Sequence, residues 1–400
     1  MKEHNQKRIL LFLVIITTAI CLRAPITSVG SILYAITADL QLSNTVAGSI
    51  TTIPLIVMAL LSPWVSQISR RTGIIRALLI GLSLLLAGIL LRSFGGIYGL
   101  LTGTALIGAG ISFGNVLIPA VIKSFFSDKI GAMTGVFTTT MSICSGIGAG
   151  ISVPLAVELG WGWRWTFCVW AVTVLVAMAV SAAQLKHMGQ TDSGRQPEIW
   201  SQKEEHVQKQ KPLYQVPLAW WMAVLFGGQS CVFYMLVSWL PTIAADRGVS
   251  VVAAGMLATV FQVAAIPANF GVPMLAGRWR NQSPLATAIA GLGVIGLIGF
   301  LLAGSVFQMA VSVAILALGL GGTFSLSLVF FAMRASDGNQ AVRLSGFAQS
   351  VGYVLAAIGP ALAGALYDWS HNWSIPLLLA VFIMVVAMVA GTVVGRDRQI

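Results

Sequence analysis

Charge is what this sequence has least of. Only 9% of its 400 residues are Asp, Glu, Lys or Arg, while 57% are hydrophobic and the mean hydropathy is +0.89. Soluble globular domains carry about 25% charged residues, so this composition excludes an ordinary soluble fold. Many apolar runs reach the length of about 20 residues that a helix needs to cross a bilayer. The composition therefore predicts a polytopic membrane protein in contact with lipid.

Residue types that carry chemistry are also scarce. The four cysteines form no Cys-x-x-Cys pair, and the four histidines are scattered over termini and loops. We therefore expect no metal site, no catalytic constellation, no cofactor and no enzymatic activity. No Gly-Lys pair occurs in the sequence, which excludes a phosphate-binding loop and with it an ATP-driven engine on this chain.

Basic residues set the expected topology. The net charge of +11 does not indicate nucleic-acid binding, because Lys and Arg fall in short loops between apolar spans. Nearly all of them fall on one side of the span map, and the other side holds Arg92, Arg164 and Arg247. We expect a multi-pass protein of the cell (inner or plasma) membrane with both termini cytoplasmic. An outer interfacial belt is predicted from Trp161, Trp163 and Trp165.

Apolar runs between charged or turn-rich breaks predict twelve transmembrane helices. They lie at about 9–36, 45–68, 74–93, 97–122, 130–157, 163–184, 217–241, 250–275, 284–303, 306–333, 341–366 and 375–394. Residues 185–216 carry a dense set of charges and predict a cytoplasmic linker. The expected fold is an all-α membrane protein with six helices in residues 1–184 and six in residues 217–400.

The two halves repeat one another in sequence. A shift of 207 residues aligns Asp39 with Asp246, and a shift of 211 residues aligns Gly110 with Gly321. Further matches keep the same register at equivalent spans. Parallel repeats of this kind predict two pseudo-symmetric halves with a binding site between them.

Arg23 is the residue that points most directly to a function. It lies near the middle of the first apolar run, roughly 21 Å along the helix, so it cannot easily reach either surface of a hydrocarbon core about 30 Å thick. Burying an arginine there costs about 2.5 to 3.5 kcal/mol, and such a charge is a candidate functional residue. The alternative is a structural arginine bonded to helix carbonyls.

Other polar side chains are candidates for the same site. Thr27 lies one turn after Arg23 on the same face of the helix. The remaining candidates are amides and tyrosines of spans four, seven, eight and eleven: Asn115, Gln229, Tyr234, Gln262, Gln349 and Tyr353. An amide in hydrocarbon either binds a ligand or joins two helices, and both interpretations stay open. Bonds to helix carbonyls are the preferred interpretation for Ser112, Thr138 and Ser142.

Several short motifs occur together along the chain. Among them are Leu22-Arg23-Ala24-Pro25-Ile26-Thr27, Gly114-Asn115-Val116-Leu117-Ile118-Pro119, Trp239-Leu240-Pro241 and Ser345-Gly346-Phe347-Ala348-Gln349-Ser350. Over nearly all 400 residues the chain resembles the major facilitator superfamily, and within it the family of cyanate and nitroimidazole transporters. Two departures stand out. The loop between spans two and three lacks the acidic residue that is usual in the superfamily, and span five lacks the Gly-Pro-x-x-Gly-Gly signature of drug/proton antiporters.

The resemblance implies a secondary transporter that works by alternating access on a cyanate-like anion or a nitro-heteroaromatic compound. The planar, permanently charged fork of Arg23 suits such a small anionic or strongly polar solute. We expect a monomer in the lipid bilayer with a small-molecule substrate and no nucleic acid. Two alternatives stay open: an efflux pump for neutral drug-like compounds, in which Arg23 holds helices together, and a membrane sensor that does not transport.

Overall fold

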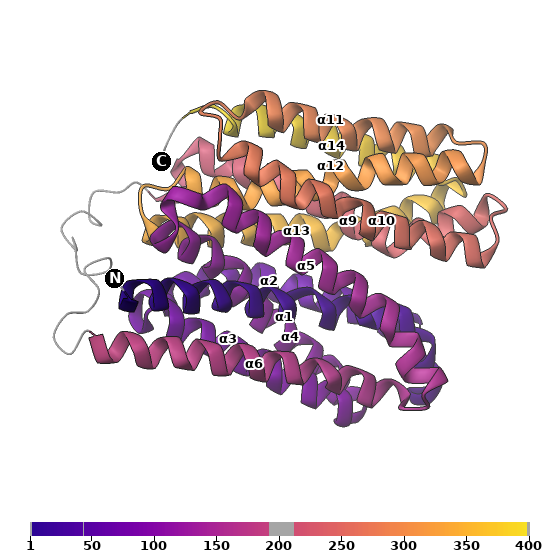
Figure 1. Ribbon diagram of the computed structural model, residues 1–400. Coiled ribbons are helices and arrows are strands. Elements are labelled where there is room, and N and C mark those ends of the chain that lie inside the picture. Colours follow the sequence, from indigo (N-terminus) through magenta and orange to yellow (C-terminus); the bar gives the residue numbers. More distant parts are fainter. Residues whose placement is uncertain (1, 43, 192–211, 398–400) are drawn as a thin grey trace. The chain divides into compact units, whose positions relative to one another are not determined.

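The computed structural model describes residues 2–42, 44–191 and 212–397. Its long helices are α1 (Lys2–Leu40), α2 (Asn44–Thr72), α3 (Ile74–Phe94), α4 (Gly96–Phe125), α5 (Ile130–Val153), α6 (Gly162–Thr191), α9 (Pro217–Asp246), α10 (Val251–Ala276), α11 (Ser283–Leu302), α12 (Val306–Met333), α13 (Gly338–Ser370) and α14 (Ser374–Val394) (Figure 1). Short helical turns are η1 (Ser127–Lys129), η2 (Pro154–Glu158) and η3 (Leu213–Gln215).

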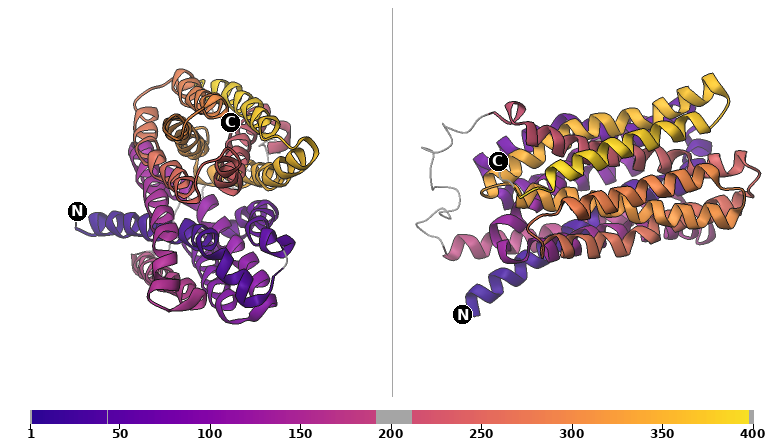
Figure 2. Two further views of the ribbon diagram at one scale, coloured as in Figure 1. Left: turned by 90° about the vertical axis from the view of Figure 1, so that its right-hand side faces the viewer. Right: turned by 90° about the horizontal axis from the view of Figure 1, so that it is seen from above.

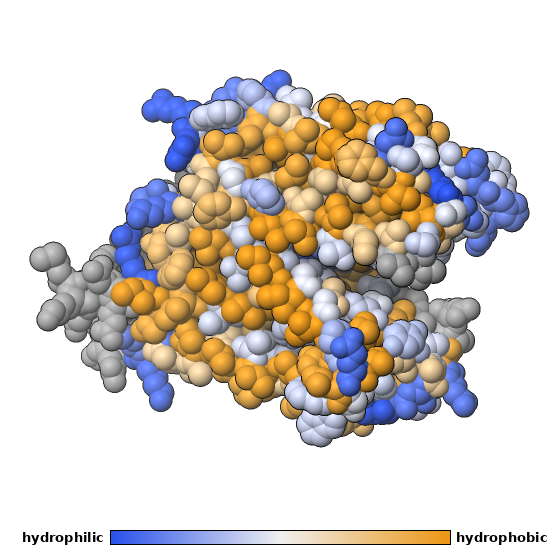
Figure 3. Space-filling view, turned by 45° about the vertical axis from the view of Figure 1, so that its right-hand side comes forward, coloured by the Kyte–Doolittle hydropathy of each residue, from blue (hydrophilic) through white to orange (hydrophobic). Residues whose placement is uncertain are grey.

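The predicted all-α membrane fold is confirmed. In the part of the chain that the structure describes, twelve helices are long and apolar enough to cross a membrane. On the face drawn in Figure 3, hydrophobic side chains cover the lengths of the helices and hydrophilic ones gather toward their ends. A lipid-facing surface has this pattern because hydrocarbon cannot solvate polar groups.

Several helices extend beyond the predicted apolar runs. α1 begins at Lys2, α13 ends at Ser370, and α6 continues to Thr191, inside the predicted linker at 185–216. An apolar run marks only the part of a helix that contacts hydrocarbon, so polar turns at its ends escape prediction. The rest of the predicted linker, residues 192–211, lies outside the described residues.

The chain forms two compact units that exchange segments. The first consists of Met1–Ser127, Ile143–Pro212 and Asp337–Gly346, and the second of Asp128–Ser142, Leu213–Ser336 and Phe347–Ile400. Helices α5 and α13 therefore each contribute their N-terminal part to one unit and the remainder to the other. The division into halves at 185–216 stays a prediction.

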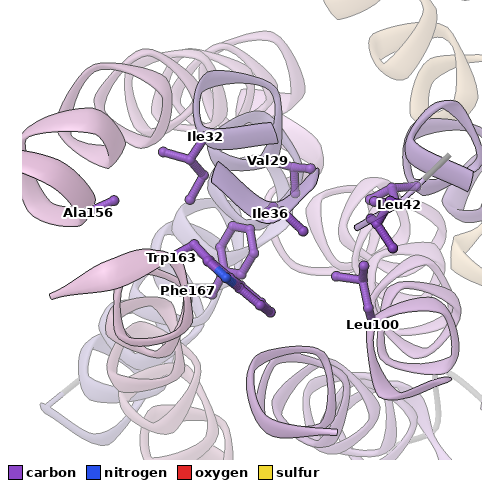
Figure 4. Packing of buried hydrophobic residues seen from close by; sticks show 9 residues of the cluster. Val29, Ile32, Ile36, Leu42, Leu100, Ala156, Trp163 and Phe167 are labelled. Atoms are coloured by element: carbon purple, nitrogen blue, oxygen red, sulfur yellow. The ribbon is translucent and has the colours of Figure 1, made fainter. Parts of the chain in front are cut away.

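Glycines let the helices of the first unit approach closely. A Cβ atom on Gly103 of α4 would lie 2.4 Å from the backbone nitrogen of Arg92 on α3. Beside this α3–α4 pair, α1 packs on α6 through buried apolar side chains, among them Ile32, Ile36 and Phe167 (Figure 4). In the most apolar stretch of α4, 89% of the residues are buried, so this helix forms the centre of the first unit.

The second unit has the corresponding arrangement. α12 is its central helix, and 83% of the residues in the most apolar stretch of α12 are buried. A Cβ on Gly319 of α12 would lie 2.2 Å from the backbone nitrogen of Gly293 on α11, so these helices touch through their backbones. In both views of Figure 2, α11, α12 and α14 of this unit, coloured orange to yellow, run alongside one another. At one end of the unit, Arg334 binds the carbonyl oxygens of Val394 at 2.9 Å and Gly395 at 3.0 Å.

Candidate functional site

Arg23 lies where α1 is held between two other helices of the first unit. Leu22 fits against Gly114 of α4, where a Cβ would come within 2.5 Å of the leucine side chain. Ala24 fits against Gly148 of α5, where a Cβ would lie 3.0 Å from its Cα. Arg23 between them is half-buried. Contacts this close fix the rotation of α1 about its axis and therefore the direction in which Arg23 leaves the helix.

Two further candidates belong to this part of the first unit. Asn115 follows Gly114 on α4 and is only 5% exposed, so the α1–α4 contact brings it to the level of Arg23. The Thr27 hydroxyl lies 3.0 Å from the Ser145 carbonyl oxygen of α5 and 3.2 Å from the carbonyl oxygen of Arg23. Its single proton is therefore donated within the protein. Thr27 links α1 to α5, and its role as a substrate ligand stays a prediction.

In the second unit, three candidates gather where α9 crosses α13. A Cβ on Gly227 of α9 would lie 2.8 Å from the Cα of Gly352 on α13. Gln229 on α9, with 2% exposure, and Gln349 on α13, with 0%, are within a turn of this contact. Tyr353, which is 3% exposed, meets the ring of Phe226 edge-on at 5.2 Å. The crossing thus concentrates polar groups in an otherwise apolar unit.

The remaining two candidates lie where α9 meets α10. Phe233 of α9 stacks on Phe261 of α10 with ring centroids 5.7 Å apart. Tyr234 and Gln262, each the next residue along its helix, are both half-buried. Among the described residues the Gln262 side chain makes no hydrogen bond, and its role as a solute ligand stays a prediction. The structure therefore places three predicted residues in the first unit and five in the second.

Asn269 on α10 was missed by the sequence analysis. Its amide nitrogen donates to the Ser142 hydroxyl at 2.7 Å, and its backbone carbonyl accepts from Thr138 at 2.8 Å. Ser112 likewise donates to the Gly108 carbonyl at 3.0 Å. The preferred interpretation, that these hydroxyl groups are structural, agrees with these contacts. Asn269 could have been identified from the sequence, because it is an amide inside the predicted apolar span at 250–275.

One position is described more closely by the structure, and one assignment made from the sequence needs correction. Arg92, counted on the outer side at the end of the span at 74–93, is in the last turn of α3 and is 1% exposed. Trp163 was predicted in an interfacial belt with Trp161 and Trp165, yet it is 4% exposed while they are 48% and 60% exposed. The reason is tertiary: Trp163 donates from Nε1 to Asp39 at 3.1 Å, which turns its ring toward α1. Hydropathy alone cannot distinguish a helix end in solvent from one covered by neighbours.

The described residues offer little for a metal or a redox group. No group of three or more His, Cys, Asp or Glu side chains in the described ranges could hold a metal ion. The four cysteines are free thiols. The candidate residues carry one guanidinium, four amides, one aliphatic hydroxyl and two phenols, which are groups suited to binding.

Comparisons with known proteins identify related transporters. Residues 11–357 match the family model of the Major Facilitator Superfamily. The chain is 38% identical to an uncharacterized transporter, YycB, of Bacillus subtilis over 99% of this chain and 96% of that one. It is 33% identical to the 2-nitroimidazole transporter of Escherichia coli, over 99% and 98% of the two chains. The cyanate transport protein CynX of Escherichia coli is 27% identical over 94% and 96%.

Solved structures share the fold. The transporter FucP in its outward conformation aligns with a TM-score of 0.71 and 13% identity, over 96% of this chain and 98% of that one. The proton:xylose symporter XylE aligns with a TM-score of 0.74 and 11% identity, over 96% and 95%. Three observations point to one family. The described residues form twelve membrane-type helices, the family model matches most of the chain, and relatives align with it over nearly its whole length. The chain belongs to the major facilitator superfamily, in the group that includes nitroimidazole and cyanate transporters.

Proposed function

We propose that this protein carries a small anionic or strongly polar solute across the cell membrane by alternating access, with Arg23 as the principal binding residue. The candidate substrates are cyanate-like anions and nitro-heteroaromatic compounds. The observation that carries the proposal is a half-buried arginine in the middle of an apolar span, held in a defined direction by glycine contacts on both sides. A guanidinium in a dry setting binds oxyanions and nitro-type oxygens strongly because little water competes.

The named relatives support the same class of substrate. One is named for 2-nitroimidazole and another for cyanate, and both align over at least 94% of this chain. The two solutes share small size and partial or full negative charge on their terminal atoms. Arginine provides one charge, and amides and phenols provide adaptable hydrogen bonds, so candidate residues of these types suit this combination.

The setting of this transporter is also part of the proposal. We infer a cell-membrane location with both termini cytoplasmic, because nearly all Lys and Arg residues fall on one side of the span map. Transport leaves the solute chemically unchanged, so no enzymatic step is assigned. The protein is proposed to act as a monomer.

The first prediction tests the charge at position 23. Arg23→Gln should weaken binding of cyanate or 2-nitroimidazole about 10- to 100-fold, because a charge-assisted hydrogen bond contributes about 1.5 to 3 kcal/mol. Arg23→Lys should retain part of the affinity, since it keeps the charge and loses the planar fork. The measurement is equilibrium binding to purified protein, followed by uptake into proteoliposomes.

Arg247→Gln is the matched control for the loss of a positive charge. Arg247 lies just after α9 and is half-buried, and it donates to the Phe300 carbonyl oxygen at 2.7 Å. This variant should bind the solutes normally. If Arg23→Gln binds and transports as well as the wild type while folding normally, Arg23 is a structural residue, and efflux of neutral compounds becomes the better interpretation.

A further inference from the structure

Arg92 is a second arginine in the first unit, and its backbone is held rigidly. It lies in the last turn of α3, where the Cα of Arg92 is only 2.8 Å from the Cβ position of Gly103 on α4. No side chain fits between the two helices at this level. The guanidinium therefore extends from a fixed backbone toward the other helices of the unit, and its side chain is 1% exposed.

Two contacts define the position of the Arg92 guanidinium. Its Nη1 donates to the carbonyl oxygen of Pro25 on α1 at 2.8 Å. Its Cζ lies 4.0 Å from the centroid of the Phe167 ring on α6, so one face of the guanidinium is covered by an aromatic ring. Figure 4 shows Phe167 beside Trp163 and close to Ile36, within the apolar cluster of this unit. The guanidinium therefore lies in a dry setting.

The other edge of the guanidinium is unused. Nε and Nη2 of Arg92 are buried, and neither has a hydrogen-bond partner among the described residues. These two nitrogens carry the parallel N–H groups that form the side-on fork of arginine, the edge that binds anions through two bonds. A buried polar group is nearly always satisfied, so two orphaned donors on one edge indicate an occupant.

Among the residues that the structure describes, no acid forms an ion pair with Arg92. The neighbour with which it interacts electrostatically is the Cys168 thiol on α6, a group that is ordinarily neutral. Asp39, the acid that approaches this part of α6, is already engaged by Arg164 at 2.8 Å and by Trp163. Water could satisfy the two N–H groups, but it would leave the charge uncompensated, which is costly away from solvent.

We propose that the Nε/Nη2 edge of Arg92 holds a small monovalent anion, of the halide or linear pseudohalide class, as a resident ion of the first unit. One positive charge calls for one negative charge, and the apolar surroundings favour an ion that is small and easily dehydrated. The site is separate from that of Arg23. Residues 23 and 25 are about 200° apart around α1, so Arg92, bound at Pro25, approaches nearly the opposite side of the helix.

The test measures thermal unfolding of the purified full-length protein in chloride, bromide or thiocyanate, compared with gluconate at equal ionic strength. Gluconate is too large for a buried site and serves as the reference anion. A resident ion should raise Tm saturably with its concentration, because it binds the folded state alone. In Arg92→Gln this response should be lost, and in Arg23→Gln and Arg247→Gln it should remain.

A second measurement keeps the proposal testable if Arg92→Gln fails to fold. Bromide soaked into crystals of the wild-type protein should give an anomalous peak within hydrogen-bond distance of Nε and Nη2 of Arg92. The proposal is overturned if Tm of the wild type is the same in chloride and gluconate. It is also overturned if the halide response disappears in Arg23→Gln and persists in Arg92→Gln, since the anion would then occupy the transport site.

Discussion

At the scale of single residues, the same side chain has different roles in different settings. Arg92 and Arg334 are both arginines at the ends of apolar helices, yet Arg92 leaves two of its nitrogens without a partner among the described residues. Arg334 binds two backbone carbonyl oxygens and the Gln282 side chain. It therefore ties the end of α14 to its unit. Burial lowers the pKa of the Arg334 guanidinium, and the carboxylate of Asp397 opposes that effect.

The residue-scale prediction concerns Tyr353. Tyr353→Phe should weaken solute binding about 2- to 10-fold, because it removes one neutral hydrogen bond and leaves the ring contact with Phe226 in place. Tyr98→Phe is the control, since Tyr98 is 82% exposed. Equilibrium binding to the two purified variants decides the matter. If Tyr353→Phe and Tyr98→Phe bind the solute with equal affinity, Tyr353 does not belong to the proposed site.

At the scale of helices, backbone proximity organises the contacts of both units. The N-terminal part of α5 belongs to the second unit, where it meets α10 through small residues. A Cβ on Gly131 would lie 2.1 Å from the Pro273 carbonyl oxygen, and a Cβ on Gly135 would lie 3.0 Å from that of Phe270. The Asn269–Ser142 hydrogen bond continues the same contact along α5. This contact is sensitive to volume because backbone atoms form it.

The helix-scale prediction follows from that geometry. Gly131→Ala should destabilise the protein by about 1 to 3 kcal/mol, since the carbonyl of Pro273 cannot move aside without shifting α10. Gly146→Ala lies on the same helix, where an added Cβ meets nothing within 4 Å. It should be neutral or stabilising, because alanine is the better helix former by up to about 1 kcal/mol. Thermal unfolding in detergent compares the two, and identical Tm values would contradict the close contact.

At the scale of the whole molecule, the distribution of titratable groups bears on how transport is driven. On the span map predicted from the sequence, all 12 acidic residues fall in loops, termini or helix ends. Arginine does not release its proton at physiological pH. An anion entering alone would move against an inside-negative potential of about 2.3 kcal/mol per charge per 100 mV, which disfavours uptake by uniport. Three modes of transport are consistent with this charge pattern: exchange of one anion for another, export of the anion, or carriage of a proton on the solute itself.

The whole-molecule prediction is that binding lacks a protein proton site. With the ionisation state of the solute held constant, affinity should change little between about pH 6 and 8, because arginine carries its charge throughout this range. Binding to purified protein at a series of pH values provides the measurement. A steep loss of affinity across the range, with the solute's charge unchanged, would reveal a titrating protein group and contradict the prediction.

Much of the architecture follows from the sequence alone. Apolar runs separated by charges located all twelve helices, because the hydrocarbon thickness dictates how long such a run must be. Arg23 also stood out from the sequence, since a charge in mid-membrane is costly wherever the helix packs. The motifs around it indicated the superfamily that the comparisons then showed.

The tertiary structure decided which neighbours each residue has. Three features depend on residues more than 65 positions away in the sequence. They are the burial of Arg92 against Phe167, the inward rotation of Trp163 and the hydrogen bond from Asn269 to Ser142. Hydropathy describes each segment in isolation, whereas these contacts depend on how segments rotate and cross. The same holds for the exchange of α5 and α13 segments between the two units. A run of apolar residues determines that a helix crosses the membrane, and the close contacts between helices determine which of its faces meets protein.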